Sequence, residues 1–255
     1  MRLIDTHTHF YSKEFEKDFE QTLKRAKNAG ITKFYMPGID STVIDVMLKL
    51  EMLYPREFFP MMGLHPCSVK ENYLEELKIV EEYLSKRKFV AVGEIGLDFY
   101  WDTTFLKEQY DAFQKQMELA LSHKLPIVIH TRNAIQETIE AVKPFAAEGL
   151  RGIFHCFGDS NETAKQIINL GFYLGIGGVL TYKKANIPEA LEDIDLKHIV
   201  LETDAPYLSP VPYRGKRNES SYLLNIAEKL AEVKKVSVEE VARITTENAE
   251  KIFGH

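Results

Sequence analysis

The sequence predicts an α/β protein that folds as a (β/α)₈ barrel, the TIM barrel, and three observations support this. Short runs rich in β-branched and aromatic residues alternate with longer amphipathic runs. The alternation repeats eight times within 255 residues, and barrels of this class typically have about 250 residues. The first strand leads into Asp5-Thr-His-Thr-His9, not into the glycine-rich turn that would favour a doubly wound open sheet. We therefore expect one domain over residues 1–255.

Each repeat consists of a short strand followed by a helix. The expected strands span residues 3–6, 32–36, 58–63, 89–94, 126–130, 152–155, 172–176 and 198–203. The expected helices span residues 12–29, 42–53, 73–85, 105–122, 134–147, 162–170, 188–193 and 223–233, with an added helix at 238–252. Gly30 and Gly149 follow two of these helices, as residues that tolerate positive φ should.

Composition and charge exclude several classes of protein. Lys and Arg number 32 and Asp and Glu 38, so the net charge is −6. This balance argues against a protein that coats nucleic acid nonspecifically, but it allows a local basic groove. No apolar run approaches the roughly 18 residues that a membrane span needs, and Asp5 comes too early for a signal peptide. Because there are only two cysteines, Cys67 and Cys156, we expect reduced thiols and a cytoplasmic protein.

Several His, Glu and Asp residues stand at or just beyond the carboxyl ends of the expected strands. In a parallel barrel these ends meet at one face, so the side chains can form a common site. A lone buried histidine is more often a hydrogen-bonded core residue. Burying several histidines and carboxylates together without partners is costly, however, and their shared position predicts a metal centre. The candidate ligands are His7, His9, Glu94, His130, His155 and Asp204.

The number of candidate ligands favours two divalent ions over one, because a catalytic ion often has three protein ligands and an open position. Side chains alternate along a strand, so His7 and His9 point the same way and can hold one ion. Glu94 lies midway round the barrel and is the expected bridge. The other ligands divide into His7, His9 and Asp204 for one ion and His130 and His155 for the second.

The chemistry of these ligands predicts a metal-dependent hydrolase. Imidazole and carboxylate ligands suit zinc or manganese and form weaker sites for magnesium. Two ions about 3.5–4 Å apart can generate hydroxide near neutral pH and clamp a phosphate, or polarise a carbonyl. Asp5 lies two residues before His7, and Glu202 lies two residues before Asp204, so each carboxylate points to the same side of its strand as the ligand that follows it. We expect both carboxylates to orient ligands without binding metal themselves.

The ordered motifs resemble those of the TatD-type metal-dependent deoxyribonucleases, which belong to the amidohydrolase-like barrels. The motifs are Asp5-Thr-His-Thr-His9, Gly63-Leu-His-Pro66, Gly93-Glu-Ile-Gly-Leu-Asp98, Ile129-His-Thr-Arg132, His155-Cys-Phe157 and Leu201-Glu-Thr-Asp-Ala-Pro-Tyr-Leu208. The resemblance covers residues 3–253 and implies the same six metal residues. It also implies magnesium-supported cleavage of DNA from 3′ ends, single-stranded or damaged, with Asp204 as ligand and proton acceptor and Glu94 in the catalytic site.

Four further residues are candidates for substrate binding. His65 follows the third strand, and we expect it to contact a phosphate; a core position is the alternative. Arg132 follows the fifth strand and can pair bidentately with a phosphate, the alternative being a surface arginine that begins a helix. Arg214 and Arg217 follow the eighth strand, where barrels often form a phosphate site.

The aromatic residues 99–101 follow the fourth strand and offer two interpretations. Aromatic rings at this face can stack on a base. The alternative is a hydrophobic lid under the following helix.

Three functions remain open from the sequence. The first is a two-metal exodeoxyribonuclease that acts from 3′ to 5′, with Mg²⁺ for activity and Zn²⁺ or Mn²⁺ able to occupy the site. The second is a metal-dependent ester or amide hydrolase, such as a D-aminoacyl-tRNA deacylase. The third is a noncatalytic metal-bound interaction protein. The sequence does not determine the oligomeric state, and a monomer is compatible with it.

Overall fold

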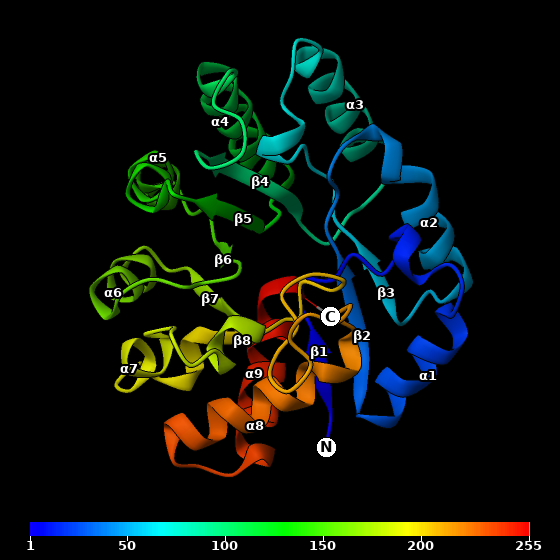
Figure 1. Ribbon diagram of the computed structural model, residues 1–255. Helices are drawn as coiled ribbons and strands as arrows, with labels where there is room; N and C mark the ends of the chain where they lie inside the picture. The colour runs from blue at the N-terminus through cyan, green and yellow to red at the C-terminus, as the bar shows by residue number, and fades with distance from the viewer. Residues whose placement is uncertain (255) are drawn as a thin grey trace.

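The computed structural model describes residues 1–254, which form a ring of parallel strands surrounded by helices (Figure 1). The strands are β1 (Leu3–Asp5), β2 (Ile31–Met36), β3 (Phe58–Pro60), β4 (Val92–Asp98), β5 (Ile127–Arg132), β6 (Gly152–Phe154), β7 (Tyr173–Ile176) and β8 (Ile199–Leu201). They pair in chain order, from β1 to β3 and from β4 to β8. The predicted (β/α)₈ barrel is confirmed.

Two seams connect these sheets into the ring. A single parallel bridge pairs Met62, just after β3, with Val92 at the start of β4. A second parallel bridge pairs Thr8, beyond the end of β1, with Ala205, beyond the end of β8. At the second seam the backbone N–H of His9 donates to the carbonyl of Ala205 at 2.8 Å, and that of Asp204 donates to His7 at 2.9 Å. This seam brings candidate ligands from opposite ends of the chain side by side.

Helices lie around the outside of the ring, except for the last helix, which lies behind it (Figure 1). They are α1 (Phe19–Asn28), α2 (Ile44–Leu53), α3 (Tyr73–Lys86), α4 (Leu106–His123), α5 (Ile135–Ala147), α6 (Asn161–Asn169), α7 (Ile187–Leu191), α8 (Leu223–Lys234) and α9 (Val238–Phe253). Ser160 and Ser237 cap α6 and α9, since each hydroxyl accepts a backbone N–H of the first turn. Within residues 1–254, the helices are all too short or too polar to cross a membrane.

Apolar side chains fill the barrel toward the amino ends of the strands. Ile4, Tyr35, Val128 and Val200 come from four strands and form one buried cluster with Phe253 of α9. The rings of Tyr35 and Phe253 stack with their centroids 4.0 Å apart. A larger apolar layer lies between the strands and the outer helices. Because α9 packs against this end of the barrel, the carboxyl end is left for polar side chains.

The fourth strand is longer than predicted. We expected it to end at Glu94, but β4 continues to Asp98 because its pairing with β5 extends to Arg132. Gly96 permits this close pairing: it has a φ of 147°, and a Cβ atom there would lie 1.9 Å from the carbonyl oxygen of His130. The extension carries a second carboxylate, that of Asp98, to the carboxyl face of the barrel.

Candidate metal centre

The six predicted ligands converge around the carboxylate of Glu94, whose two oxygens face different histidines. Oε2 lies 3.1 Å from Nε2 of His7 and 3.9 Å from Nε2 of His9. Oδ1 of Asp204 is 3.3 Å from the same nitrogen of His9. His7, His9 and Glu94 are almost completely buried. These side chains form the group that the sequence predicted for one ion.

The other oxygen of Glu94 faces the second predicted group. Oε1 lies 2.9 Å from Nδ1 of His130 and 3.1 Å from Nε2 of His155. Nε2 of His65 is also 3.4 Å from this oxygen. The two groups adjoin each other, since the rings of His7 and His155 stack with centroids 3.8 Å apart. Glu94 therefore has the position required of a bridging carboxylate.

A hydrogen bond orients the outer ring nitrogen in three of the four histidines that are candidate ligands. Nδ1 of His9 is 2.8 Å from the hydroxyl of Tyr11, and that hydroxyl donates to the carbonyl of Pro37, so His9 is the donor. Nδ1 of His155 is 3.1 Å from Glu202, and Nε2 of His130 is 2.8 Å from Asp98. In each case the outer nitrogen can keep its proton, which leaves the inner nitrogen to bind a cation once its own proton is displaced.

His65 has the opposite arrangement. Its Nδ1 accepts a hydrogen bond from the backbone N–H of Cys67 at 3.0 Å. A neutral imidazole that accepts at Nδ1 must carry its proton on Nε2, the nitrogen that faces Glu94. His65 is therefore a hydrogen-bond donor into the site and not a fifth histidine ligand, although it lies close to Glu94 and His130.

The buried nitrogens of His7 indicate that the site fits a cation. His7 is fully buried, its Nδ1 has no hydrogen-bond partner, and its Nε2 lies 3.1 Å from Oε2 of Glu94 without the geometry of a hydrogen bond. Its Nε2 faces the carboxylates of Glu94 and Asp204, which carry negative charge that a cation would neutralise. Buried polar atoms without partners are rare, and imidazole with carboxylate is a donor set that binds divalent metals.

The electrostatics of the cluster are those of a charge-balanced site. Burial acts to raise the pKa of Glu94, but the histidines around it, His155 and His7 first, hold its pKa well below the usual range. Burial acts to lower the pKa of His155, but Glu94 and Glu202 raise it well above the ordinary value. A divalent cation can replace the protons that this cluster otherwise retains.

The two predicted supporting carboxylates act in different ways. Glu202 accepts from Nδ1 of His155 and from the backbone N–H of Cys156, so it orients a ligand as predicted. Asp5 was expected to support the imidazole of His7. It accepts from the backbone N–H and the hydroxyl of Thr203 and, at 3.4 Å, from the backbone N–H of His7, but it forms no hydrogen bond with the His7 imidazole. Asp5 therefore positions the backbone beside Asp204.

The three predicted substrate arginines have different surroundings. Arg217 donates from both terminal nitrogens to Asp18, each at 2.7 Å, so its charge is already paired. Arg132 lies over the ring of Tyr100, and Arg214 lies 4.1 Å over the ring of Tyr182. Neither of these two forms an ion pair with any carboxylate of residues 1–254. The structure leaves Arg132 and Arg214, but not Arg217, with unneutralised charge.

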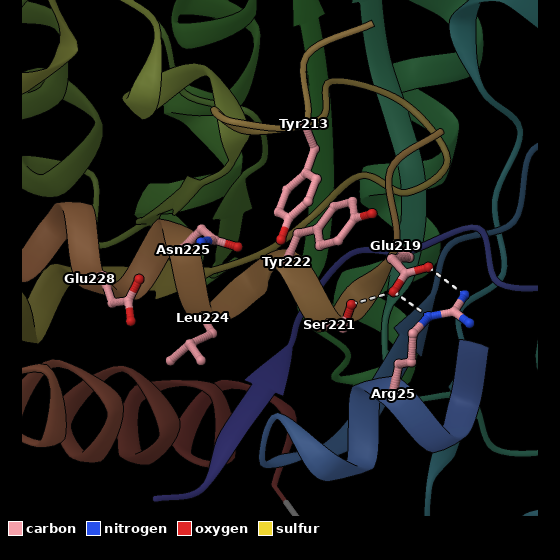
Figure 2. Close-up of a pocket in the computed structure, with 8 residues that line it drawn as sticks. All are labelled: Arg25, Tyr213, Glu219, Ser221, Tyr222, Leu224, Asn225 and Glu228. Carbon is pink, nitrogen blue, oxygen red and sulfur yellow. Dashed lines mark hydrogen bonds and ion pairs between the residues drawn. The ribbon is translucent and has the colours of Figure 1, made fainter. Parts of the chain in front are cut away.

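A separate cavity of about 510 Å³ lies between α1 and the start of α8 (Figure 2). Arg25 and Glu219 line it and pair with each other at 2.6 Å. The rings of Tyr213 and Tyr222 stack there with centroids 3.8 Å apart. Arg25 and Glu219 neutralise each other, and none of the lining residues is a candidate ligand. We assign the cavity a structural role, because the pair of Arg25 with Glu219 holds the segment after β8 against α1.

Comparison with known proteins establishes the family. A family model described as TatD related DNase matches residues 4–254. The chain belongs to the TatD-related DNase family. This confirms the resemblance inferred from the motifs.

Relatives of this TatD-family chain match along nearly its whole length. It is 38% identical to YabD of Bacillus subtilis, named an uncharacterized metal-dependent hydrolase, over 98% of each chain. It is 30% identical to YcfH of Escherichia coli K12, named likewise, over 99% of this chain and 96% of YcfH. The crystal structure of YjjV, a TatD homolog from the same organism, superposes with a TM-score of 0.94 at 28% identity, covering 100% of this chain and 98% of YjjV.

Sequence reasoning missed two members of the TatD-family site. Asp98 was quoted within a motif but given no role, although it lies four residues after Glu94 and shares its parity. Tyr11 follows His9 by two residues and accepts its outer proton, but its contact with Pro37 could not be anticipated from spacing. Side chains alternate along a strand, and the same reasoning that put His7 and His9 on one side could have put Asp98 on the side of Glu94.

Proposed function

We propose that this TatD-family protein is a metal-dependent exodeoxyribonuclease that removes nucleotides from the 3′ ends of single-stranded or damaged DNA. The observation that carries the proposal is the position of Glu94, whose two oxygens each face a separate group of ligand nitrogens. That arrangement supports two ions that share one carboxylate, and paired ions recur in enzymes that cleave phosphodiesters.

The residues divide between the two proposed ions as the distances suggest. His7, His9 and Asp204 would hold one ion, His130 and His155 the other, and Glu94 would contact both. When bound, a pair of Mg²⁺ ions would lower the pKa of a water molecule and neutralise the charge of a phosphate. Mn²⁺ and Zn²⁺ suit the same donors.

Asp204 is the proposed proton acceptor. Burial acts to raise its pKa, but its hydrogen bond with His9 and the charges of His155 and His7 lower the pKa overall. An ionised carboxylate at the carboxyl face of the barrel can take a proton from an attacking water. His65, which keeps its proton on Nε2, is the proposed donor to a phosphate oxygen.

Arg132 and Arg214 are the proposed phosphate-binding residues. Arg132 ends β5, two residues after His130, and Arg214 lies in the loop after β8. Both guanidinium groups are exposed and lie over aromatic rings, which position them without neutralising their charge. They put positive charge at the carboxyl end of β5 and in the loop after β8 of a protein whose net charge is −6.

The two thiols support the proposed cytoplasmic location. Cys67 and Cys156 are not joined in a disulfide. Burial raises the pKa of each thiol to about 12. Unpaired thiols are typical of proteins in a reducing compartment.

The test is a parallel assay with 3′-labelled and 5′-labelled single-stranded DNA, RNA of the same sequence and a D-aminoacyl-tRNA. Each is incubated with chelator-treated protein and then with Mg²⁺, Mn²⁺ or Zn²⁺. We expect nucleotides to be released from the 3′ end of DNA with Mg²⁺, and release to stop with Asp204→Asn. Asp193→Asn, an exposed acid paired with Lys165, is the matched control. Cleavage of the aminoacyl ester alone would overturn the proposal in favour of a deacylase.

A further inference from the structure

Two large aromatic side chains are exposed beside the candidate metal centre. Tyr100 is 52% exposed and Trp101 is 66% exposed, in the loop that follows β4. Trp101 is the only tryptophan of the sequence. The predicted lid under the following helix is not formed by these two rings, because both face solvent. Contiguous exposed apolar surface is a feature of binding sites.

Backbone hydrogen bonds fix this aromatic loop relative to the metal centre. Oδ1 of Asp98 accepts the backbone N–H groups of both Tyr100 and Trp101 at 2.9 Å. Its other oxygen, Oδ2, is 2.8 Å from Nε2 of His130. One carboxylate therefore connects a candidate metal ligand to the aromatic pair. Farther along the loop, Asp102 pairs with Lys70 from the segment after β3.

A guanidinium completes the cluster. The Cζ atom of Arg132 is 4.1 Å from the ring centroid of Tyr100 and 5.3 Å from that of Trp101. The two rings meet edge to face, with centroids 4.8 Å apart at 85°. No carboxylate of the described chain pairs with Arg132, so its charge is available to a ligand. The cluster thus presents flat apolar faces next to one unneutralised cation.

We propose that Tyr100, Trp101 and Arg132 form a subsite that stacks one unpaired nucleobase and binds a phosphate next to that base. This inference rests on the proposed function and specifies how the substrate is held. Aromatic faces stack on any base, and a neighbouring arginine adds attraction to the phosphate, so such a site prefers single strands without reading sequence. A duplex would not expose the base faces, which gives the subsite a physical basis for selecting frayed or single-stranded ends.

The single tryptophan allows a direct test that does not depend on cleavage. The wild-type protein with Mg²⁺ is titrated with a short oligothymidylate carrying phosphorothioate linkages, and Trp101 fluorescence is followed. We expect saturable quenching by this oligomer and little quenching by an abasic phosphorothioate oligomer of the same length. Equal quenching by both oligomers, or quenching by neither, would overturn the subsite.

Variants give an independent measurement, the anisotropy of a dye-labelled oligothymidylate. Trp101→Ala should weaken binding about 5- to 150-fold, the range found when one stacking residue is removed, and Trp101→Phe should restore most of it. Arg132→Ala should also weaken binding, whereas Arg243→Ala, an exposed arginine of α9, is the matched control. Unchanged affinity in Trp101→Ala would contradict the proposal.

These measurements separate the subsite from the nuclease itself. Quenching that requires bases, without any DNA cleavage, would support the subsite and contradict the exonuclease. Cleavage of DNA with equal affinity for the abasic oligomer would support the exonuclease and contradict the subsite. If the aromatic pair instead joins two copies of the chain, sedimentation will show a dimer that Trp101→Ala dissociates, which would also overturn the inference.

Discussion

Asp98 and His130 form a hydrogen bond of 2.8 Å that connects the metal centre to the loop after β4. The carboxylate holds the outer proton of the imidazole, while its second oxygen holds the loop that carries the exposed aromatic pair. Other metal centres use such carboxylate–histidine pairs to fix the orientation and basicity of a ligand. Here the same residue also positions a surface next to the site.

The first prediction concerns this hydrogen bond. Asp98→Asn should weaken binding of Mn²⁺ or Zn²⁺ about 10- to 100-fold, since the imidazole of His130 loses the partner that fixes its tautomer. Isothermal titration calorimetry on the chelator-treated protein measures the change. Asp102→Asn, in the same loop but bonded to Lys70, is the control and should bind metal normally. Equal affinities in the two variants would contradict the assigned role of Asp98.

The second prediction concerns the bridge. Glu94→Ala should reduce the binding of both ions and abolish hydrolysis, because its two oxygens face the two ligand groups. Elemental analysis after gel filtration gives the number of ions for each molecule. Glu202→Gln, which contacts only His155 among the ligands, should affect one ion more than the other. Normal binding of one ion in Glu94→Ala would show that the carboxylate does not bridge.

The third prediction is a pH dependence of metal binding. Without metal, burial acts to lower the pKa of His155, but Glu94 and Glu202 outweigh it and raise the pKa well above the ordinary value. A cation binds the unprotonated imidazole and so competes with a proton for it, and metal affinity should therefore rise as pH rises. Calorimetry in buffers of different ionisation enthalpy should show net proton release. Net uptake of protons would contradict the assignment.

The fourth prediction separates two arginines that sequence reasoning treated alike. Arg217→Ala should lower the free energy of unfolding by about 1 kcal/mol, because it removes a partly exposed bidentate pair with Asp18. Arg214→Ala should instead raise KM for DNA several-fold, since its guanidinium lies over the ring of Tyr182 and pairs with no carboxylate of residues 1–254. Urea unfolding and steady-state kinetics on both variants test this contrast. The reverse pattern would show that Arg217, not Arg214, binds substrate.

The fifth prediction concerns the support of Glu202. A Cβ atom at Gly175 would lie 2.3 Å from Oε2 of Glu202, so Gly175→Ala should displace that carboxylate from His155. We expect a loss of about 1–3 kcal/mol in stability together with weaker metal binding. Gly158→Ala, where the new atom would have ordinary contacts of 3.8 Å, is the matched control. Normal metal binding in Gly175→Ala would indicate that Glu202 does not hold His155 in place.

The strand and helix pattern of this protein could be predicted from its sequence because hydrophobic periodicity is local. Most boundaries fall within a few residues of the expected ones, as for the helix expected at 73–85 and found at Tyr73–Lys86. The exception that matters is β4, whose extension to Asp98 depends on pairing with β5 and on Gly96. The residues next to a strand in the sequence do not show how far its pairing with the adjacent strand extends.

The sequence by itself determined the barrel class, the family and the gathering of six side chains, because parallel strands bring their carboxyl ends to one face. Only the tertiary structure decided that Asp98 supports His130, that His65 donates a proton, that Asp18 neutralises Arg217 and that the rings of Tyr100 and Trp101 are exposed. The physical reason is the separation along the sequence over which each signal acts. Periodicity acts over neighbouring residues, whereas Asp98 and His130 are 32 residues apart and Asp18 and Arg217 are 199 residues apart, so their meeting depends on how the chain packs.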